Sequence, residues 1–190
     1  MSRLERQRQL LDAAWRLVSD EGTEALTLGR LAELAGVTKP VVYDHFGTRS
    51  GLLAALYAEF DQRQTARMDA ALESCEPRLR DRAWVIAECY IDCVFTQGRE
   101  IPGVIAALAS SPELEKIQRE YESVFLEKCR ELFSPFASDG TVSQAALRAM
   151  LGAANALSNA AVSAEISADE AKAELFETLV AMVGRRQPSS

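Results

Sequence analysis

The chain is poor in histidine and lacks several sequence motifs that mark large classes of enzymes. Its 190 residues include a single histidine, His45. No G-x-S-x-G sequence, glycine-rich phosphate loop or H-E-x-x-H sequence occurs in it. Beyond His45, no histidine is available as a catalytic base. We therefore expect a protein that is not an enzyme, with no catalytic residues, no metal and no cofactor.

The chain also lacks long hydrophobic runs and any regular cysteine pattern. No apolar run reaches the roughly 18 residues that a membrane-spanning helix needs. The first apolar stretch is interrupted by Asp12 and Arg16, so it does not resemble a signal peptide. The four cysteines show no disulfide-framework spacing, which suits a reducing compartment. These absences predict a cytoplasmic protein with no membrane partner.

Two of the cysteines are close enough in sequence to act together. Cys89 and Cys93 are four residues apart and therefore share one face of a helix. Metal sensing at this pair needs further ligands, and a helix points Glu88 and Asp92 partly away from it. We predict no metal here and keep metal or thiol sensing as an alternative.

The composition that is present favours an all-α fold. Ala, Leu, Glu and Arg dominate, and β-branched runs are scarce. A hydrophobic content of 48% is ample for a packed core. The length allows one large or two small domains.

The most informative stretch is Thr27 to Phe46, TLGRLAELAGVTKPVVYDHF, which predicts two short helices joined by a tight turn. Thr27 and Thr38 are placed to cap the two helices with their hydroxyl groups. Gly36 stands where a helix C-terminus favours a residue without Cβ, and Pro40 lies in the first turn of the second helix. The stretch therefore carries start and stop signals for both helices.

The second helix of this pair is predicted to pack one face against the core and to expose the other. Val42 and Phe46, four residues apart, face the core together. The other side chains point away from it: Lys39, Pro40, Val41, Tyr43 and Asp44. A short capped helix with polar and apolar groups on its exposed face, braced by a second helix, is the geometry of a DNA major-groove reader. By spacing alone, an ordinary helical hairpin fits equally well.

Segments between Leu10 and Leu56 resemble the N-terminal domain of the TetR family of transcriptional regulators. They are LLDAAWRLVSDEG, TEALTLGRLAELAGVTKPVVYDHF and GTRSGLLAALY, and the most specific feature is Y-x-H-F followed three positions later by a basic residue. The resemblance implies a three-helix, helix-turn-helix DNA-binding domain in residues 1–50, with a linking helix over residues 48–70. It implies a helical regulatory and dimerisation domain in residues 51–190.

The resemblance and the chemistry of DNA together give the candidate DNA contacts. Hydroxyl and N–H groups at helix N-termini suit phosphate oxygens, Lys39 suits phosphate or guanine, and Val41 suits a thymine methyl group. Tyr43 matches the family's DNA-contacting tyrosine, and Arg49 takes the place of a family lysine that can reach the backbone. Asp44 departs from expectation, since its carboxylate faces the phosphates. The candidates are Thr27, Thr38, Lys39, Pro40, Val41, Tyr43, Asp44, His45 and Arg49.

The formal net charge of −7 argues against a DNA-binding protein, but the charge is unevenly distributed. Residues 1–50 hold 7 basic and 7 acidic side chains, whereas residues 51–190 hold 14 and 21. A neutral N-terminal region can still present a basic face, and an acidic remainder repelled by DNA helps to orient the molecule. The basic start SRLERQRQ suits either a phosphate backbone or a solvated helix end. The acidic balance keeps open the alternative that the chain binds no nucleic acid.

The middle of the chain predicts helices over residues 81–97, 101–109 and 113–133. The resemblance implies that a small-molecule pocket lies in this block. The candidate pocket residues are Trp84, Glu88, Tyr90 and Phe95. Core packing is the alternative role for the three aromatic side chains.

The last two predicted helices, over residues 143–165 and 168–184, are candidates for a dimer interface. The first is rich in Ala, Gly and Ser, which lets helices approach closely, and the second carries an apolar stripe wider than one core face needs. The resemblance implies a four-helix interface between two copies. The candidate interface residues are Leu147, Leu151, Ala154, Leu157, Leu175, Leu179 and Met182.

These observations predict a homodimeric, sequence-specific DNA-binding transcriptional regulator. By resemblance, it is a repressor released from a palindromic double-stranded operator by a small-molecule effector. The alternative is a helical protein-interaction module that does not bind DNA. Salt dependence separates the two, because phosphate contacts weaken steeply with salt.

Overall fold

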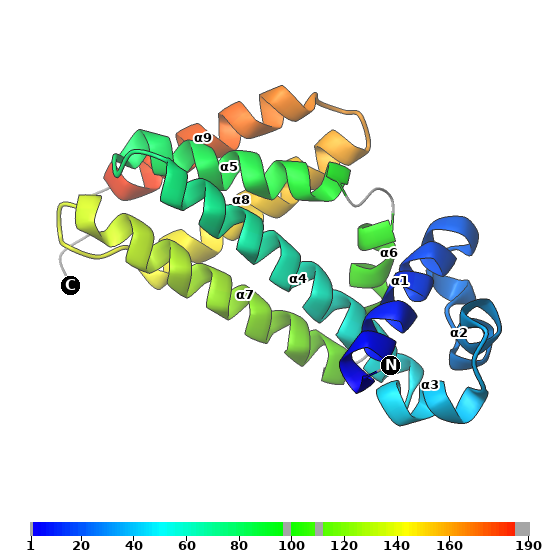
Figure 1. Cartoon of the computed structure of the whole chain (residues 1–190). Coiled ribbons are helices and arrows are strands. Elements are labelled where there is room, and N and C mark those ends of the chain that lie inside the picture. The colour runs from blue at the N-terminus through cyan, green and yellow to red at the C-terminus, as the bar shows by residue number, and fades with distance from the viewer. Residues whose placement is uncertain (1, 97–99, 109–111, 185–190) are drawn as a thin grey trace. The chain divides into compact units, whose positions relative to one another are not determined.

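The computed structural model describes residues 2–96, 100–108 and 112–184, and every regular element in these ranges is helical (Figure 1). The elements are α1 (Arg3–Glu21), η1 (Thr23–Ala25), α2 (Leu28–Ala35), α3 (Lys39–Phe46), α4 (Arg49–Ser74), α5 (Leu79–Thr96), α6 (Glu100–Leu108), α7 (Pro112–Phe133), η2 (Ser134–Phe136), α8 (Gln144–Val162) and α9 (Ala168–Gly184). The predicted all-α class is therefore confirmed. Gln97 and Ala109, the predicted ends of two helices, lie outside the described residues.

The chain packs as two compact units, and each draws on two separated segments. The first unit comprises Met1–Arg63 and Gln97–Arg119, and the second comprises Gln64–Thr96 and Glu120–Ser190. The packing therefore divides the chain differently from the predicted division at residue 50. The reason is that the first turns of α4 bury Leu52, Leu53 and Leu56 as part of the hydrophobic core.

In the first unit, helix α1 begins and ends where local sequence signals place it. Ser2 and Glu5 form a capping box, in which the Ser2 hydroxyl accepts from the Glu5 N–H and the Glu5 carboxylate accepts from the Ser2 N–H. The helix ends at Gly22, whose φ of 84° favours glycine. Between these ends, Leu10 and Leu17 lie on its buried stripe.

The helix-turn-helix pair follows the predicted pattern closely. The Thr27 hydroxyl accepts from the Arg30 N–H at 3.1 Å and caps α2. Gly36 ends α2 with a left-handed φ of 65°, a conformation that costs glycine little. Val42 and Phe46 are 0% and 7% exposed, so they anchor α3 to the core as predicted.

Helix α6 also belongs to the first unit, although it is distant in sequence. It packs against η1 and α1 and buries Val104. Gly103 approaches η1 so closely that an added Cβ would lie 2.5 Å from the Thr23 Oγ1. The connection between α1 and α2 is therefore in contact with a helix that lies far along the chain.

The second unit is a bundle in which α9 packs against both α5 and α8, while α5 also contacts α8. Its core includes Ile86, Ile91, Phe133, Met150 and Leu175, all at most 1% exposed. Ion pairs hold α5 to α9, including Lys172 with Asp92 at 2.6 Å. A search of the described residues finds no helix both long and apolar enough to span a membrane.

Candidate nucleic-acid interface

Helix α3 presents one side to solvent and is held by the other. Its two buried side chains, Val42 and Phe46, lie on the inner side, while Tyr43 is 53% exposed. Pro40 is exposed and Val41 is half-buried. An exposed tyrosine beside a small apolar group is an unusual surface for simple solvation, whereas both groups suit the edges of bases and sugars in a groove.

The N-terminus of α3 differs from that of α2 in how its threonine is used. We expected Thr38 to cap α3, but its hydroxyl makes no capping bond, so that expectation was wrong. The helix starts with Pro40 in its first turn, and Val41 donates its N–H to the Thr38 backbone carbonyl at 3.1 Å. The first turn thus closes through the backbone, and the exposed Thr38 hydroxyl is not used as a cap.

Lys39 opens α3 and is exposed, with the end of its side chain over helix α2. A Cβ added to Gly29 would lie 3.6 Å from the Lys39 Cε, at ordinary contact distance. The glycine therefore leaves room for the lysine stem to cross α2. This places a cation at the junction of the two helices.

The C-terminal end of α3 is tied to the start of α1. The Arg3 Nη2 donates to the Asp44 backbone carbonyl at 3.1 Å, which satisfies a carbonyl that the helix end leaves open. His45 is half-buried, and its ring centroid lies 6.0 Å from that of Phe46. Sequence reasoning did not single out Arg3 for this role, because nothing local shows which carbonyl an N-terminal arginine will reach.

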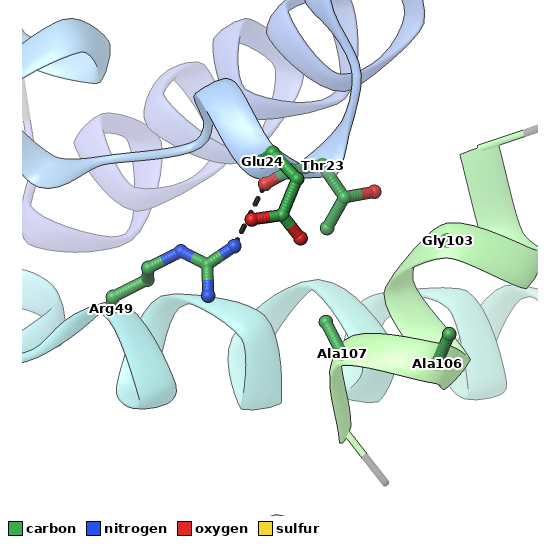
Figure 2. Close-up of a pocket in the computed structure, with 6 residues that line it drawn as sticks. All are labelled: Thr23, Glu24, Arg49, Gly103, Ala106 and Ala107. Carbon is green, nitrogen blue, oxygen red and sulfur yellow. Dashed lines mark hydrogen bonds between the residues drawn. The ribbon is translucent and has the colours of Figure 1, made fainter. Parts of the chain in front are cut away.

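Arg49, predicted as a contact to the DNA backbone, is used differently in the structure. Its Nε donates to the Leu26 carbonyl at 2.9 Å. Its Nη2 donates to the Thr23 carbonyl, also at 2.9 Å (Figure 2). The side chain is half-buried by these contacts. Arg49 thus forms hydrogen bonds within the first unit and does not lie among the exposed side chains of α3.

The arginine in α2 is likewise committed, in this case to carboxylates. Arg30 binds Glu21 through both carboxylate oxygens, at 2.6 and 3.2 Å, and reaches Glu33 at 3.2 Å. This hydrogen bonding lowers the pKa of Glu21 and raises the pKa of Arg30. The network fixes the end of α1 to α2 and neutralises charge on that side of the helix pair.

The predicted pocket residues of the second unit are not brought together. Trp84, Glu88 and Phe95 lie on the exposed side of α5, and Trp84 and Phe95 are 42% and 45% exposed. Trp84 packs edge-on against Phe176 of α9, with ring centroids 5.6 Å apart. Tertiary packing decides which face of α5 turns inward, and here these three side chains face outward.

Tyr90, the fourth predicted pocket residue, faces other helices. Its hydroxyl donates to the Asn155 Oδ1 of α8 at 2.8 Å, and its ring lies 5.5 Å from that of Phe125 in α7. These contacts give Tyr90 a packing role at the junction of three helices, which is the alternative that the sequence left open.

The predicted dimer-interface residues are largely covered within a single chain. Six of the seven residues are at most 6% exposed within a single chain: Leu147, Leu151, Ala154, Leu175, Leu179 and Met182. The seventh, Leu157, packs partly buried against the same core. The wide stripe of α9 does indicate burial on two sides, but both neighbours, α5 and α8, belong to its own chain.

Burial makes both thiols of the cysteine pair less acidic. Burial raises the pKa of Cys93 to about 12 and also raises the pKa of Cys89. Because the thiolate is the reactive and metal-binding form, both residues are weak ligands and nucleophiles at neutral pH. Across the described residues, no group of three or more His, Cys, Asp or Glu side chains is arranged to hold a metal.

Known proteins match both the sequence and the fold. Residues 10–56 match the family of bacterial regulatory proteins described as the tetR family. The match covers α1 to the first turns of α4, which includes all of the helix-turn-helix pair. It confirms the resemblance on which the candidate contacts of α3 depend.

The curated relatives match mainly through this N-terminal region. The regulator BetI of Rhizobium meliloti (strain 1021) is 40% identical over 50 residues, which cover 26% of this chain and 25% of BetI. The activator FasR of Mycolicibacterium smegmatis is 36% identical over 95 residues, covering 50% and 42% of the two chains. The class D tetracycline repressor of Escherichia coli is 36% identical over 84 residues, covering 44% and 38%. The matches thus span less than half of each of these relatives.

Solved structures match over nearly the whole chain. The TetR-family transcriptional regulator SCO4454 of Streptomyces coelicolor has a TM-score of 0.70 at 20% identity, and the match covers 93% of both chains. A regulator from Saccharomonospora viridis, solved in complex with choline, has a TM-score of 0.75 at 15% identity, with 96% and 99% covered. At these identities the likeness concerns the fold.

Proposed function

We propose that the chain is a homodimeric, sequence-specific regulator of transcription that inserts α3 into the DNA major groove. The observation that carries this proposal is the exposed face of α3, with Tyr43 at its centre, within the segment that matches the tetR family. The buried Val42 and Phe46 hold this face in a fixed orientation. Fixed orientation matters because base edges are recognised by hydrogen bonds of defined geometry.

The exposed groups of α3 divide into two kinds of contact. Thr38 and Lys39, at its N-terminus, suit phosphate oxygens, because the hydroxyl is not used as a cap and the helix end carries partial positive charge. Val41 and Tyr43 suit base edges and the thymine methyl group. Asp44 accepts from a cytosine amino group or excludes other bases at its position.

The second unit supplies the dimer contact in this proposal, through the faces that a single chain leaves open. Ala149, Gly152 and Ala156 of α8 are exposed and lie three to four residues apart, so they form one small-residue face. Small side chains allow a partner helix to approach closely. A two-fold dimer would place two α3 helices in successive major grooves, about 34–36 Å apart.

Residues 51–190 would also receive a small-molecule effector that releases the protein from its operator. The tetracycline repressor among the relatives, and the choline complex among the similar folds, support a repressor that responds to a small molecule. The effector acts by favouring one spacing of the two α3 helices in the dimer over another. We place this activity in the cytoplasm, where bacterial DNA lies, with no cofactor.

The first test is selection of bound duplexes from a random-sequence pool, with the full chain at physiological salt. We expect enrichment of a two-fold symmetric sequence whose half-sites are centred about 10–10.5 base pairs apart, or a multiple of that spacing. The selected duplex then serves as the probe for effector screening by loss of binding.

A control selection uses the Tyr43→Ala chain under the same conditions. Enrichment of the same sequence by both chains would contradict the role given to α3. No enrichment by the wild-type chain, together with the absence of salt-sensitive duplex binding, would favour the helical protein-interaction module instead.

A further inference from the structure

Arg49 joins the two ends of the helix-turn-helix segment. Leu26 is the last residue before the Thr27 cap of α2, and Arg49 is the first residue of α4, three positions after Phe46 at the end of α3. The guanidinium group donates from Nε to the Leu26 carbonyl and from Nη2 to the Thr23 carbonyl, both at 2.9 Å. One side chain therefore closes the segment that contains both α2 and α3.

We propose that Arg49 is a positioning residue for DNA binding, which fixes the entry of α2 relative to the exit of α3 and does not itself contact DNA. The inference rests on the proposed function, because positioning has meaning only if α3 reads DNA. Leu26 is fully buried, so its carbonyl is a fixed point of the core. Anchoring the start of α4 to that point sets the direction in which α3 leaves the core.

The chemistry of the contact requires arginine. The Thr23 carbonyl already accepts from the Leu26 N–H at 3.2 Å within η1, and Arg49 adds a second donor to it. The guanidinium group presents several N–H donors in a rigid fork, so Nε and Nη2 reach two separate carbonyls at once. A lysine ammonium group at the end of a flexible stem keeps the charge but lacks this fork.

The opposite side of the same turn is held by α6. Figure 2 shows Arg49 beside Thr23 and Glu24 of the turn, with Gly103, Ala106 and Ala107 of α6 facing them. The residues line a cavity of about 400 Å³ that is open to solvent. Because this space is open, a shorter or straighter side chain at position 49 fits without overpacking. Variants at Arg49 therefore test the hydrogen bonds and not the fit of the side chain.

Two substitutions separate positioning from a phosphate contact. Arg49→Lys keeps the charge and loses the fork, whereas Arg49→Met keeps much of the aliphatic stem and loses both charge and donors. Affinity for the selected duplex is measured by fluorescence anisotropy at several salt concentrations. We expect both variants to bind about tenfold more weakly than wild type, since neither side chain can hold the Leu26 and Thr23 carbonyls together through a rigid fork of donors. We expect both to keep the wild-type slope of log affinity against log salt.

Lys39→Met is the matched control, because it makes the same chemical change at a proposed phosphate contact. Its slope should become shallower by about 0.9, the value for one phosphate of duplex DNA that is no longer neutralised. The proposal is overturned if Arg49→Lys binds like wild type while Arg49→Met shows the shallower slope. That pattern would indicate that Arg49 contacts the DNA backbone directly.

Amide hydrogen exchange tests the positioning without DNA. In both Arg49 variants, amides of residues 23–35 should exchange at least about threefold faster than in wild type, because the turn before α2 loses its anchor. Unchanged exchange in these residues would refute the positioning role. If the wild-type chain selects no duplex but the exchange result holds, then the proposed function has failed and the Arg49 hydrogen bonds remain as a structural feature.

Discussion

Helices α3 and α9 use their apolar residues in opposite ways. Helix α3 buries two side chains and leaves Tyr43 53% exposed, so much of its surface remains open to a ligand. Helix α9 buries Leu175, Leu179, Met182 and Val183 between two helices of its own chain. Exposure in a short helix therefore marks a candidate recognition surface, whereas a wide apolar stripe in a long helix marks the inside of a bundle.

The two regions differ because their surroundings differ. The α3 segment is eight residues long and is bounded by a turn and a glycine, so few arrangements of its faces are possible. The α5, α8 and α9 helices are 18, 19 and 17 residues long, and each could turn any of several faces inward.

Placing a charge in the α9 core should unfold the second unit, whereas a charge on the exposed face of α8 should not. Leu179→Arg buries an unpaired cation at a position that is 0% exposed, which should cost at least about 4 kcal/mol of unfolding free energy. Ala156→Arg lies on the open face and should keep the fold. Urea unfolding and size-exclusion chromatography provide the measurements.

The same pair of variants tests the dimer face. If Ala156 lies at the contact between two copies, Ala156→Arg should elute as a folded single chain, because it sets two like charges near the two-fold axis. A Leu179→Arg chain that elutes as a folded dimer would show that Leu179 is not in the core. An Ala156→Arg chain that elutes as a dimer would move the interface to another face.

Removing the exposed aromatic group of α3 should impair DNA binding without affecting stability. Tyr43→Ala should weaken affinity for the selected duplex by about 10- to 100-fold, which corresponds to the removal of one or two interactions with bases or phosphates. The matched control is Phe95→Ala, an aromatic residue of similar exposure at 45% in the second unit. Wild-type affinity in Tyr43→Ala, or an equal loss of affinity in Phe95→Ala, would contradict the contrast between the two regions.

Substitutions of the two threonines in the helix-turn-helix pair should distinguish an effect on stability from an effect on DNA binding. Thr27→Ala loses the cap of α2 and should lower the unfolding free energy by about 1 kcal/mol. Thr38→Ala loses no capping bond and should change the unfolding free energy by less than about 0.5 kcal/mol, but it should weaken DNA binding. Thermal unfolding and anisotropy on the selected duplex distinguish the two effects. Equal destabilisation by both substitutions would mean that the Thr38 hydroxyl caps α3 in solution.

Much of the first unit could be predicted because its signals are local. Gly22 and Gly36 end helices at positive φ, Thr27 caps the next helix, and the four-residue spacing of Val42 and Phe46 sets the inner face of α3. Each of these features depends on a few neighbouring residues. The capping role expected of Thr38 failed because Val41 closes the first turn through the Thr38 carbonyl instead.

The roles of Arg3 and Arg49 could not be predicted, since each depends on a carbonyl distant in sequence. Arg3 reaches the Asp44 carbonyl 41 residues away, and Arg49 reaches back 26 residues to Thr23. From sequence, a basic residue near a helix-turn-helix segment is expected to bind DNA phosphates, unless the fold brings a protein carbonyl within reach of its side chain. Here the fold supplies one for each of them.

Composition alone indicates the helical class, and local signals define the boundaries of α2 and α3 and the exposed face of α3, because caps, glycines and four-residue spacing act within one or two turns. Tertiary packing was needed to place Leu179 in a core and Trp84 at the surface, and to bring Arg49 to the Leu26 carbonyl. The physical reason is that a helix pattern defines which residues share a face, whereas the neighbour that covers that face is chosen by the packing of the whole unit.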